Sequence, residues 1–406
     1  MAEAKWRTFR RDSRKGDYTM TCRHAFTAGL ALLLSMGLAA AEEPVQAASA
    51  EATGPTVEEE SVEEGRPARG FVLPWTPLQL GVAGNWQIFR KDTPVRGLRL
   101  GLLSDDTKDV AGISLAGVVS RSERRGGIEA APVAHGGRLR GLSLAGVSLA
   151  KSEDGSGPAV RGFQASVAYN RAKGDTQGLQ LSSGVNRTDG DLTGPQVGGL
   201  VSTTAGNLTG LQVGGLVSTT AGDLSGPQVG GLVSTTARNL SGPQVGGLVS
   251  TTAGNLTGLQ IGGVASTTAG DLAGLQVGGL ASTTAGDLTG LQIGGLAGGA
   301  KKTRGVQLAG FFTAAEEVSG AQVSLVSNSF RLQTDDLRFS GPRQVSGLQL
   351  ACGYNRAGSV NGLQIGLVNR AGELRGAQIG LLNFRNGRLG FPLINPARDR
   401  KPRTGE

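Results

Sequence analysis

The centre of the chain repeats with a period of 16 residues. Each repeat contains a glutamine followed by valine or isoleucine, and a glycine stands two residues before each glutamine. The seven glutamines that share this register are Gln196, Gln212, Gln228, Gln244, Gln260, Gln276 and Gln292. Chance does not place seven units at one spacing, and a short fixed period is typical of proteins that stack one structural unit on the next.

The same frame extends in a less regular form on both sides of the central units. The additional units are centred on Gln79, Arg99, Ser114, Ser143, Gln164, Gln180, Gln307, Gln322, Gln349, Gln364 and Gln378. Most of these positions are 14–16 residues apart, and we expect the longer gaps to be loops between units. Residues 71–396 are therefore predicted to form one array of about 18 units.

The residues within a unit favour short strands. A representative unit reads Gly210-Leu-Gln-Val-Gly-Gly-Leu-Val-Ser-Thr-Thr-Ala-Gly-Asp-Leu-Ser225. Valine and threonine suit strands, glycine beside Asp or Asn suits tight turns, and the array shows no helical period. We predict an all-β fold, a parallel β-solenoid of about 18 coils of 14–16 residues. Coils stacked about 4.8 Å apart would make an array of roughly 85 Å.

The positions of the apolar residues suggest which side chains face inward. Val213 and Leu216 are three residues apart, so strict alternation fails, but a bend at Gly214-Gly215 would let both face the interior. Leu208 and Leu224 would then supply the opposing inward contacts.

The main alternative fold is an outer-membrane β-barrel, which also consists of strands in exported bacterial proteins. Barrel strands are about 9–11 residues long and carry aromatic girdles. The seven central units contain no aromatic residue, and glycine pairs interrupt every strand. Pro195, Pro227 and Pro243 cannot donate to a β-ladder, so we expect them at corners of a coil. Membrane insertion is therefore not favoured.

Composition excludes several classes of function. Glycine contributes 68 residues and aromatics only 4%, so little apolar area is available for a thick core. His24 and His135 are the only histidines, which argues against a His-dependent triad or a multi-His metal site. Cys352 is the only cysteine beyond the N-terminal segment, and we expect it to be a small buried residue. We predict no catalytic residue, no metal and no cofactor.

The net charge of +8 does not indicate a nucleic-acid partner. Residues 1–41 carry seven Lys/Arg and three Asp/Glu, and the remaining residues carry 33 and 29. No basic block alternates with aromatic residues, so no nucleic-acid binding is predicted.

Residues 1–41 read as an export segment. A basic stretch precedes an apolar run of about 15 residues and the sequence Ala39-x-Ala41, which is the layout of a signal peptide. Met20 could be the true start, with an extension before it. Residues 42–70 are predicted to be a disordered acidic linker, and residues 397–406 a basic tail. We expect export across the inner membrane, to the periplasm, the outer membrane or the cell surface.

Two columns of polar residues would form if the coils stack directly. The sequence Ser-Thr-Thr recurs in six units, and its central residues form a possible ligand ladder: Thr203, Thr219, Thr235, Thr251, Thr267 and Thr283. Threonine also suits exposed strands for structural reasons alone. The second column is Asp191, Asn207, Asp223, Asn239, Asn255, Asp271 and Asp287. Calcium could bind stacked carboxylates, but Asp and Asn beside glycine are explained by turn formation.

Two short segments resemble catalytic motifs only superficially. Residues 294–303 approach a phosphate-binding loop, but Ala300 stands where that motif needs glycine. Ser148 and Lys151 have the Ser-x-x-Lys spacing of serine acylases, without the accompanying motifs.

The C-terminal units carry a resemblance to a known group of proteins. Gly362-Leu-Gln-Ile-Gly-Leu-Val-Asn369 and Gly376-Ala-Gln-Ile-Gly-Leu-Leu-Asn383 resemble the GLQIGLVN repeats of an uncharacterised bacterial surface-repeat family. The opening Arg96–Leu103 and the closing Phe391–Pro396 are similar to segments of that family. In the central units, glycine replaces leucine at Gly215 and serine replaces asparagine at Ser218. The resemblance implies a surface repeat protein and carries no activity or catalytic residue.

Together these features predict a non-enzymatic exported repeat protein that acts as a structural or adhesin-like module of the cell envelope. The alternatives are a glycan- or ice-binding solenoid that uses the Ser-Thr-Thr ladder, or the outer-membrane barrel. The partner is not identified by the sequence, and a glycan or another envelope component would fit.

Overall fold

The computed structural model describes residues 74–83, 86–152, 157–328 and 342–396. The chain divides into two units, Met1–Ala68 and Arg69–Glu406, and the first lies wholly outside the described residues. The expected signal segment, the acidic linker 42–70 and the basic tail 397–406 also lie outside them. No helix of the described residues is long and apolar enough to cross a membrane.

The described residues form 36 strands. The N-terminal strands are β1 (Thr76–Ala83), β2 (Trp86–Gln87), β3 (Val95–Gly101), β4 (Ser104–Ala116), β5 (Val119–Lys151), β6 (Val160–Lys173), β7 (Thr176–Ser182) and β8 (Val185–Thr188). The central strands are β9 (Leu192–Thr193), β10 (Gln196–Gly198), β11 (Val201–Thr204), β12 (Leu208–Thr209), β13 (Gln212–Gly214), β14 (Val217–Thr220), β15 (Leu224–Ser225), β16 (Gln228–Gly230), β17 (Val233–Thr236), β18 (Leu240–Ser241), β19 (Gln244–Gly246), β20 (Val249–Thr252), β21 (Leu256–Gly262), β22 (Ala265–Thr268), β23 (Leu272–Gly278), β24 (Ala281–Thr284), β25 (Asp287–Gly294) and β26 (Ala297–Gly299). The C-terminal strands are β27 (Lys302–Ala309), β28 (Phe312–Ala314), β29 (Glu317–Ser324), β30 (Ser327–Asn328), β31 (Gln344–Ala351), β32 (Tyr354–Ile365), β33 (Val368–Gly380), β34 (Leu382–Arg385), β35 (Arg388–Leu389) and β36 (Leu393–Pro396).

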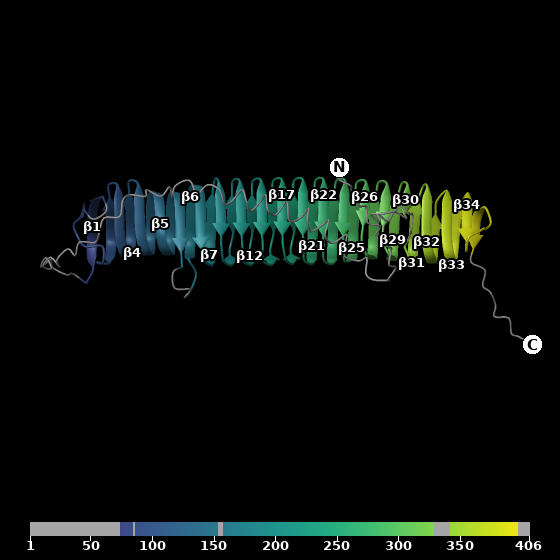
Figure 1. Ribbon diagram of the computed structural model, residues 1–406, viewed down its shortest axis with the longest axis horizontal. Helices are drawn as coiled ribbons and strands as arrows, with labels where there is room; N and C mark the ends of the chain where they lie inside the picture. Colours follow the sequence, from purple (N-terminus) through teal and green to yellow (C-terminus); the bar gives the residue numbers. More distant parts are fainter. Residues whose placement is uncertain (1–73, 84–85, 153–156, 329–341, 397–406) are drawn as a thin grey trace, which may run out of the picture. The chain divides into compact units, whose positions relative to one another are not determined.

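Successive coils pair in parallel, with like residues in register. In the centre, β13 pairs with β16 so that Gln212 lies beside Gln228, and β14 pairs with β17 so that Thr219 lies beside Thr235. Figure 1 shows successive coils side by side along the array, with β17, β22 and β26 as labelled members of one ladder. The predicted parallel β-solenoid of about 18 coils is confirmed. The alternative, an outer-membrane barrel, is wrong for these residues because neighbouring strands of such a barrel run antiparallel.

Each central coil places one apolar column and three polar columns inside. The apolar column consists of leucines and includes Leu208 and Leu224, as expected. The inward polar residues are the glutamine, the serine and the second threonine of each unit, all of them almost completely buried. The expectation that Val213 and Leu216 face inward is wrong. Side chains alternate along β13, so the burial of Gln212 turns Val213 outward, and Leu216 lies on the corner, 44% exposed.

The glycine two residues before each glutamine forms a sharp bend in every coil. In the central units its φ lies between 126° and 137°, a region that glycine adopts readily and other residues rarely do. A Cβ on any of these glycines would overlap the carbonyl oxygen of the equivalent glycine in the preceding coil. The recurring glycine is therefore required by both the bend and the close stacking.

The three prolines lie where strands are interrupted, as predicted. Pro195 separates β9 from β10, and Pro227 and Pro243 separate the equivalent pairs in later coils. In β21, β23 and β25, which carry leucine at this position, the strand runs through without a break. The coil of Leu211, stacked between the coils of Pro195 and Pro227, is broken like its neighbours. The interruption therefore accompanies the prolines, whose missing N–H group cannot donate to the ladder.

Two irregular spacings keep the register of the stack. Gln349 pairs with Gln322, so the ladder continues in register, and residues 329–341 of the predicted loop between them lie outside the described residues. The gap between Ser114 and Ser143, by contrast, contains a further coil, in which Glu129 occupies the glutamine position. Because Glu129 replaces the glutamine that defines the other units, the sequence pattern does not reveal this coil.

The central units differ by an insertion from the last two units, those of Gln364 and Gln378. Parallel registers place Ser202 beside Asn186, and Asn355 beside Asn369, so serine and asparagine occupy one inward column. Gln212 and Ser218 are six residues apart, whereas Gln364 and Asn369 are five apart. The central coils therefore carry one extra glycine at the corner, and the interpretation of Gly215 as a replacement for leucine is corrected.

Antiparallel strands close both ends of the array. At the start, β2 pairs with β1 on the side opposite to β3. At the end, β36 pairs with β33 and β35 pairs with β34, each antiparallel. These strands cover backbone edges that would otherwise be open to pairing with another chain.

We predict that Gly290→Ala destabilises the array by about 2–4 kcal/mol, because alanine disfavours the φ of 129° and its Cβ would overlap the carbonyl oxygen of Gly274. The matched control is Gly299→Ala, whose Cβ would meet only the Thr283 side chain at 3.9 Å and should change stability by less than about 1 kcal/mol. Urea unfolding followed by circular dichroism measures both. Equal effects of the two substitutions would contradict the assigned bend.

Candidate functional site

The predicted ligand ladder forms a continuous outward column. Equivalent central threonines of the Ser-Thr-Thr segments pair in register from coil to coil. Thr203, Thr219, Thr235 and Thr267 are half-buried, Thr283 is exposed and Thr251 is buried. The structure therefore brings all six predicted residues onto one side of the array, with uneven access to solvent.

The other two residues of each Ser-Thr-Thr segment face inward and are hydrogen-bonded. Ser218 Oγ donates to the backbone oxygen of Val229 in the next coil at 2.7 Å. Thr220 Oγ1 donates to Gln212 Oε1 of its own coil at 3.0 Å. At most one hydroxyl of each segment, that of the central threonine, is thus available to a ligand, and in the coil of Thr251 that one is buried as well.

A column of buried glutamines forms the centre of the interior. Gln244 Nε2 donates to Gln228 Oε1 at 2.7 Å and to the backbone oxygen of Thr251 at 3.2 Å. Its Oε1 accepts from Gln260 Nε2 at 2.8 Å and from Thr252 Oγ1 at 3.1 Å. Both donor and acceptor groups of the amide are therefore satisfied inside the coil. We call this set the Gln column: Gln164, Gln180, Gln196, Gln212, Gln228, Gln244, Gln260, Gln276, Gln292, Gln307, Gln322, Gln349, Gln364 and Gln378.

The Gln column has a defined end at each side. Asn395 of the closing strand β36 donates from Nδ2 to Gln378 Oε1 at 2.9 Å. At the other end, Gln164 Nε2 donates to the Oγ and the backbone oxygen of Ser148. Both ends of the column are hydrogen-bonded, so neither leaves an amide group to act on a ligand.

The column of Asp and Asn residues also has a structural role. From Asp191 to Asp271, the side-chain oxygen of each accepts a hydrogen bond from the backbone N–H of the equivalent residue in the next coil. Asp191 Oδ1 accepts from Asn207 at 2.7 Å, and Asn207 Oδ1 accepts from Asp223 at 2.9 Å. Because Asp and Asn both offer this oxygen, the column tolerates either residue. The turn role expected from the sequence thus includes a bond between coils.

A shallow groove lies beside this column. It has a volume of about 410 Å³ and is lined by one Asp or Asn and one Ser or Thr from each of several coils, with the leucine column beneath. Its lining includes Asn207, Asp223, Thr209 and Ser225. The groove presents hydroxyl, amide and carboxylate groups to solvent at regular intervals along the array.

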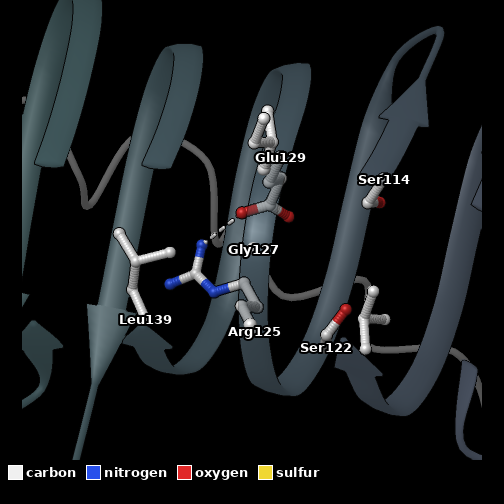
Figure 2. A pocket seen from close by; sticks show the side chains of 9 residues that line it. Ser114, Ser122, Arg125, Gly127, Glu129 and Leu139 are labelled. Atoms are coloured by element: carbon white, nitrogen blue, oxygen red, sulfur yellow. Dashed lines mark hydrogen bonds and ion pairs between the residues drawn. The ribbon is translucent and has the colours of Figure 1, made fainter. Parts of the chain in front are cut away.

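A buried ion pair replaces the usual core residues in one coil. Arg125 stands in the apolar column beside Val110, and Glu129 stands in the position of the glutamines. Arg125 Nη1 lies 3.0 Å from Glu129 Oε2. Figure 2 marks this ion pair with a dashed line. Glu129 Oε1 also accepts from Ser120 Oγ at 2.6 Å. The adjoining cavity is about 10 Å³, which is too small for a substrate.

Small residues beside these long side chains make room for them. Arg99 is buried in the column of the glutamine position, to which Glu129 also belongs. It donates hydrogen bonds to Ser114 and Ser122. Ser114 precedes Glu129 in the column, and Ser143 follows it with its Oγ 3.5 Å from Glu129 Oε2. Long and short side chains thus alternate at this end of the stack, which points to a packing role for the charged residues.

Asp189 bridges two arginines on the surface of neighbouring coils. Its carboxylate lies 2.8 Å from Arg171 Nη2 and 2.7 Å from Arg187 Nε. Burial opposes ionisation of Asp189, but hydrogen bonds from the two arginines outweigh it, so its pKa is lowered. The nearby Tyr169 has a pKa raised mainly by burial. Asp189 therefore stays ionised at neutral pH and offsets the repulsion between the two arginines.

The two segments that resemble catalytic motifs do not have the arrangement that those motifs require. Ser148 is buried and hydrogen-bonded to Gln164, whereas Lys151 is exposed at the end of β5. Residues 294–303 run through β25, β26 and β27 and supply no helix N-terminus. Within the described ranges, no group of His, Cys, Asp and Glu residues is arranged to hold a metal ion. Cys352 is exposed at a corner, so the expectation that it is buried is wrong.

Comparison of the chain with protein-family models, curated proteins and solved structures gave no match.

We predict that Gln244→Met lowers the free energy of unfolding by about 2–4 kcal/mol, because Gln228 Oε1, Gln260 Nε2 and Thr252 Oγ1 would each lose a buried partner. Gln177→Met is the matched control on an exposed position and should cost less than about 0.5 kcal/mol. Guanidinium unfolding curves give both values. If Gln244→Met left the free energy of unfolding unchanged, the Gln column would not be a source of stability.

Proposed function

We propose that this protein is a non-enzymatic structural module of the bacterial cell envelope, exported and held as a rigid β-array. The observation that carries the proposal is the assignment of the polar side chains. Glutamine, serine and one threonine of each central unit are turned inward and hydrogen-bonded to one another. They stabilise the stack and are unavailable for chemistry on a substrate.

The ends of the array support the same proposal. The antiparallel strands at both ends limit the array to a fixed number of coils. A closed array of about 18 coils, each about 4.8 Å thick, would act as a spacer of roughly 85 Å. The export segment and the resemblance to bacterial surface-repeat proteins favour the envelope as its location.

We predict that the chain with a C-terminal epitope tag fractionates with the envelope or periplasm of its host and begins after Ala41. Leu33→Arg with Leu34→Arg should block export, since both residues interrupt the apolar run of the signal segment. Cell fractionation and N-terminal sequencing test this, and protease treatment of intact cells distinguishes the outer surface from the periplasm. A full-length chain in the cytosol would contradict the proposed location.

A second candidate function is binding of a glycan, or of ice, along the array. The observation in its favour is the outward threonine column, which repeats a hydroxyl once per coil in register. The groove beside the Asp and Asn column offers further hydrogen-bonding groups at the same spacing. An extended polymer with its own regular repeat is the class of ligand that such columns would match.

For this second candidate, we expect Thr219→Leu, Thr235→Leu and Thr267→Leu together to abolish binding. The control variant carries leucine at the neighbouring Ala205, Ala221 and Ala285 and should retain it. Glycan arrays and partition into growing ice provide the measurements. Absence of binding by the unmodified chain, or binding that survives loss of the threonines, would make the column purely structural.

A further inference from the structure

The outward side of the Gln-bearing strands is apolar throughout the array. The residues directly before and after each glutamine face outward, and in the seven central coils they are all leucine, proline, valine or isoleucine. The corner leucine and the residue that follows it continue this surface. In one coil these residues are Leu211, Val213, Leu216 and Val217. We call the whole surface the apolar flank.

The apolar flank is accessible and continuous. Its corner residues are 39–50% exposed, a range set by Val264 and Leu280. They lie in one column, because the backbone N–H of each donates to the equivalent oxygen of the preceding coil, as from Leu232 to Leu216 at 2.8 Å. The flank continues outside the centre, where Leu115, Phe311 and others are exposed in equivalent places.

The area of the apolar flank exceeds that of an ordinary surface patch. Seven residues of extended backbone across seven coils cover about 700–800 Å², at roughly 3.3 Å per residue and 4.8 Å per coil. The largest apolar patch of a typical monomer is about 300–600 Å². Stable interfaces bury about 800 Å² on each partner, a value that the central coils almost reach and the flanking coils would exceed.

We propose that the apolar flank binds the same flank of a second copy of this chain, so that two arrays lie side by side. Identical faces with the same coil spacing can interdigitate their side chains, as paired sheets do in dry zipper interfaces. Such contact of one surface with itself is the usual symmetric dimer.

Charge and topology favour a second copy over other occupants. Among residues 195–297 the charged side chains are Asp223, Arg238, Asp271 and Asp287, and none lies on the flank. A lipid-binding surface would carry basic residues beside the apolar ones. The antiparallel strands at the ends hinder end-to-end growth, which leaves the sides for association. The inference rests on the fold and does not require the proposed function.

The test is the mass of the purified full chain, measured by light scattering during size exclusion. We expect a dimer, twice the mass of the monomer. The variant Leu216→Lys, Leu232→Lys and Leu280→Lys should halve this mass. Its control, Thr219→Lys, Thr235→Lys and Thr283→Lys, changes the same three coils on another side and should remain dimeric. A monomeric unmodified chain, or a dimer that survives the leucine changes in folded protein, would overturn the proposal.

A second measurement does not depend on the folding of the lysine variants. In a Cys22→Ser, Cys352→Ser background, a cysteine is placed by Leu232→Cys or Thr235→Cys, and its rate of maleimide labelling is followed against protein concentration. We expect protection that increases with concentration at position 232 only. Equal labelling at both positions would overturn the dimer. Monomers that sediment with phosphatidylglycerol vesicles through the same leucines would assign the flank to lipid instead.

Discussion

The hydrogen bonds of the Gln column determine how the coils stack. A backbone ladder alone would accept a coil displaced by a residue or more, because the ladder is the same at every step. The buried amide of Gln244 has no such freedom, since it needs Gln228 on one side and Gln260 on the other. A displaced coil would leave a buried donor and acceptor unpaired, at about 1–3 kcal/mol each. The repeated glutamine therefore selects one register.

This interior reverses the usual distribution of side chains. Only the leucine column is apolar inside the central coils, whereas valine, isoleucine and leucine cover the outer side of the Gln-bearing strands. A coil of about 16 residues is too narrow to enclose many large side chains, so the stack obtains its stability along its axis. Its amide and hydroxyl groups bond from coil to coil, and the displaced apolar residues become a surface that can associate.

The sequence predicted the architecture because the period itself carries that information. Seven glutamines at one spacing required like residues to stack, and the prolines and glycines marked the corners. It did not predict the orientation of the strands about their axes. The apolar character of Val213 and Leu216 favours the interior, but the buried glutamines need hydrogen-bond partners inside the coil and leave these two residues outside. The signal that could have corrected this was the invariance of glutamine beside a variable Val or Ile.

The candidate sites, like the fold, could be predicted only where they follow from the period of the sequence. The outward threonine column followed from the period alone, once the coils were stacked directly. The bond from Asp191 to the backbone of Asn207 could not be predicted, because it depends on the relative position of two coils. The Arg125–Glu129 pair was hidden for another reason: its residues interrupt the pattern that defined the units, although the coil keeps its place in the stack.

The most direct test of direct stacking is the distance between spin labels at positions 203 and 283, measured by pulsed electron resonance on a Thr203→Cys, Thr283→Cys double variant. The two positions are five coils apart, so the parallel stack predicts a separation of about 24 Å, at roughly 4.8 Å per coil. If each unit instead formed two antiparallel strands, the same positions would be about 48 Å apart. A distance near the longer value would contradict the parallel stack and the Gln column with it.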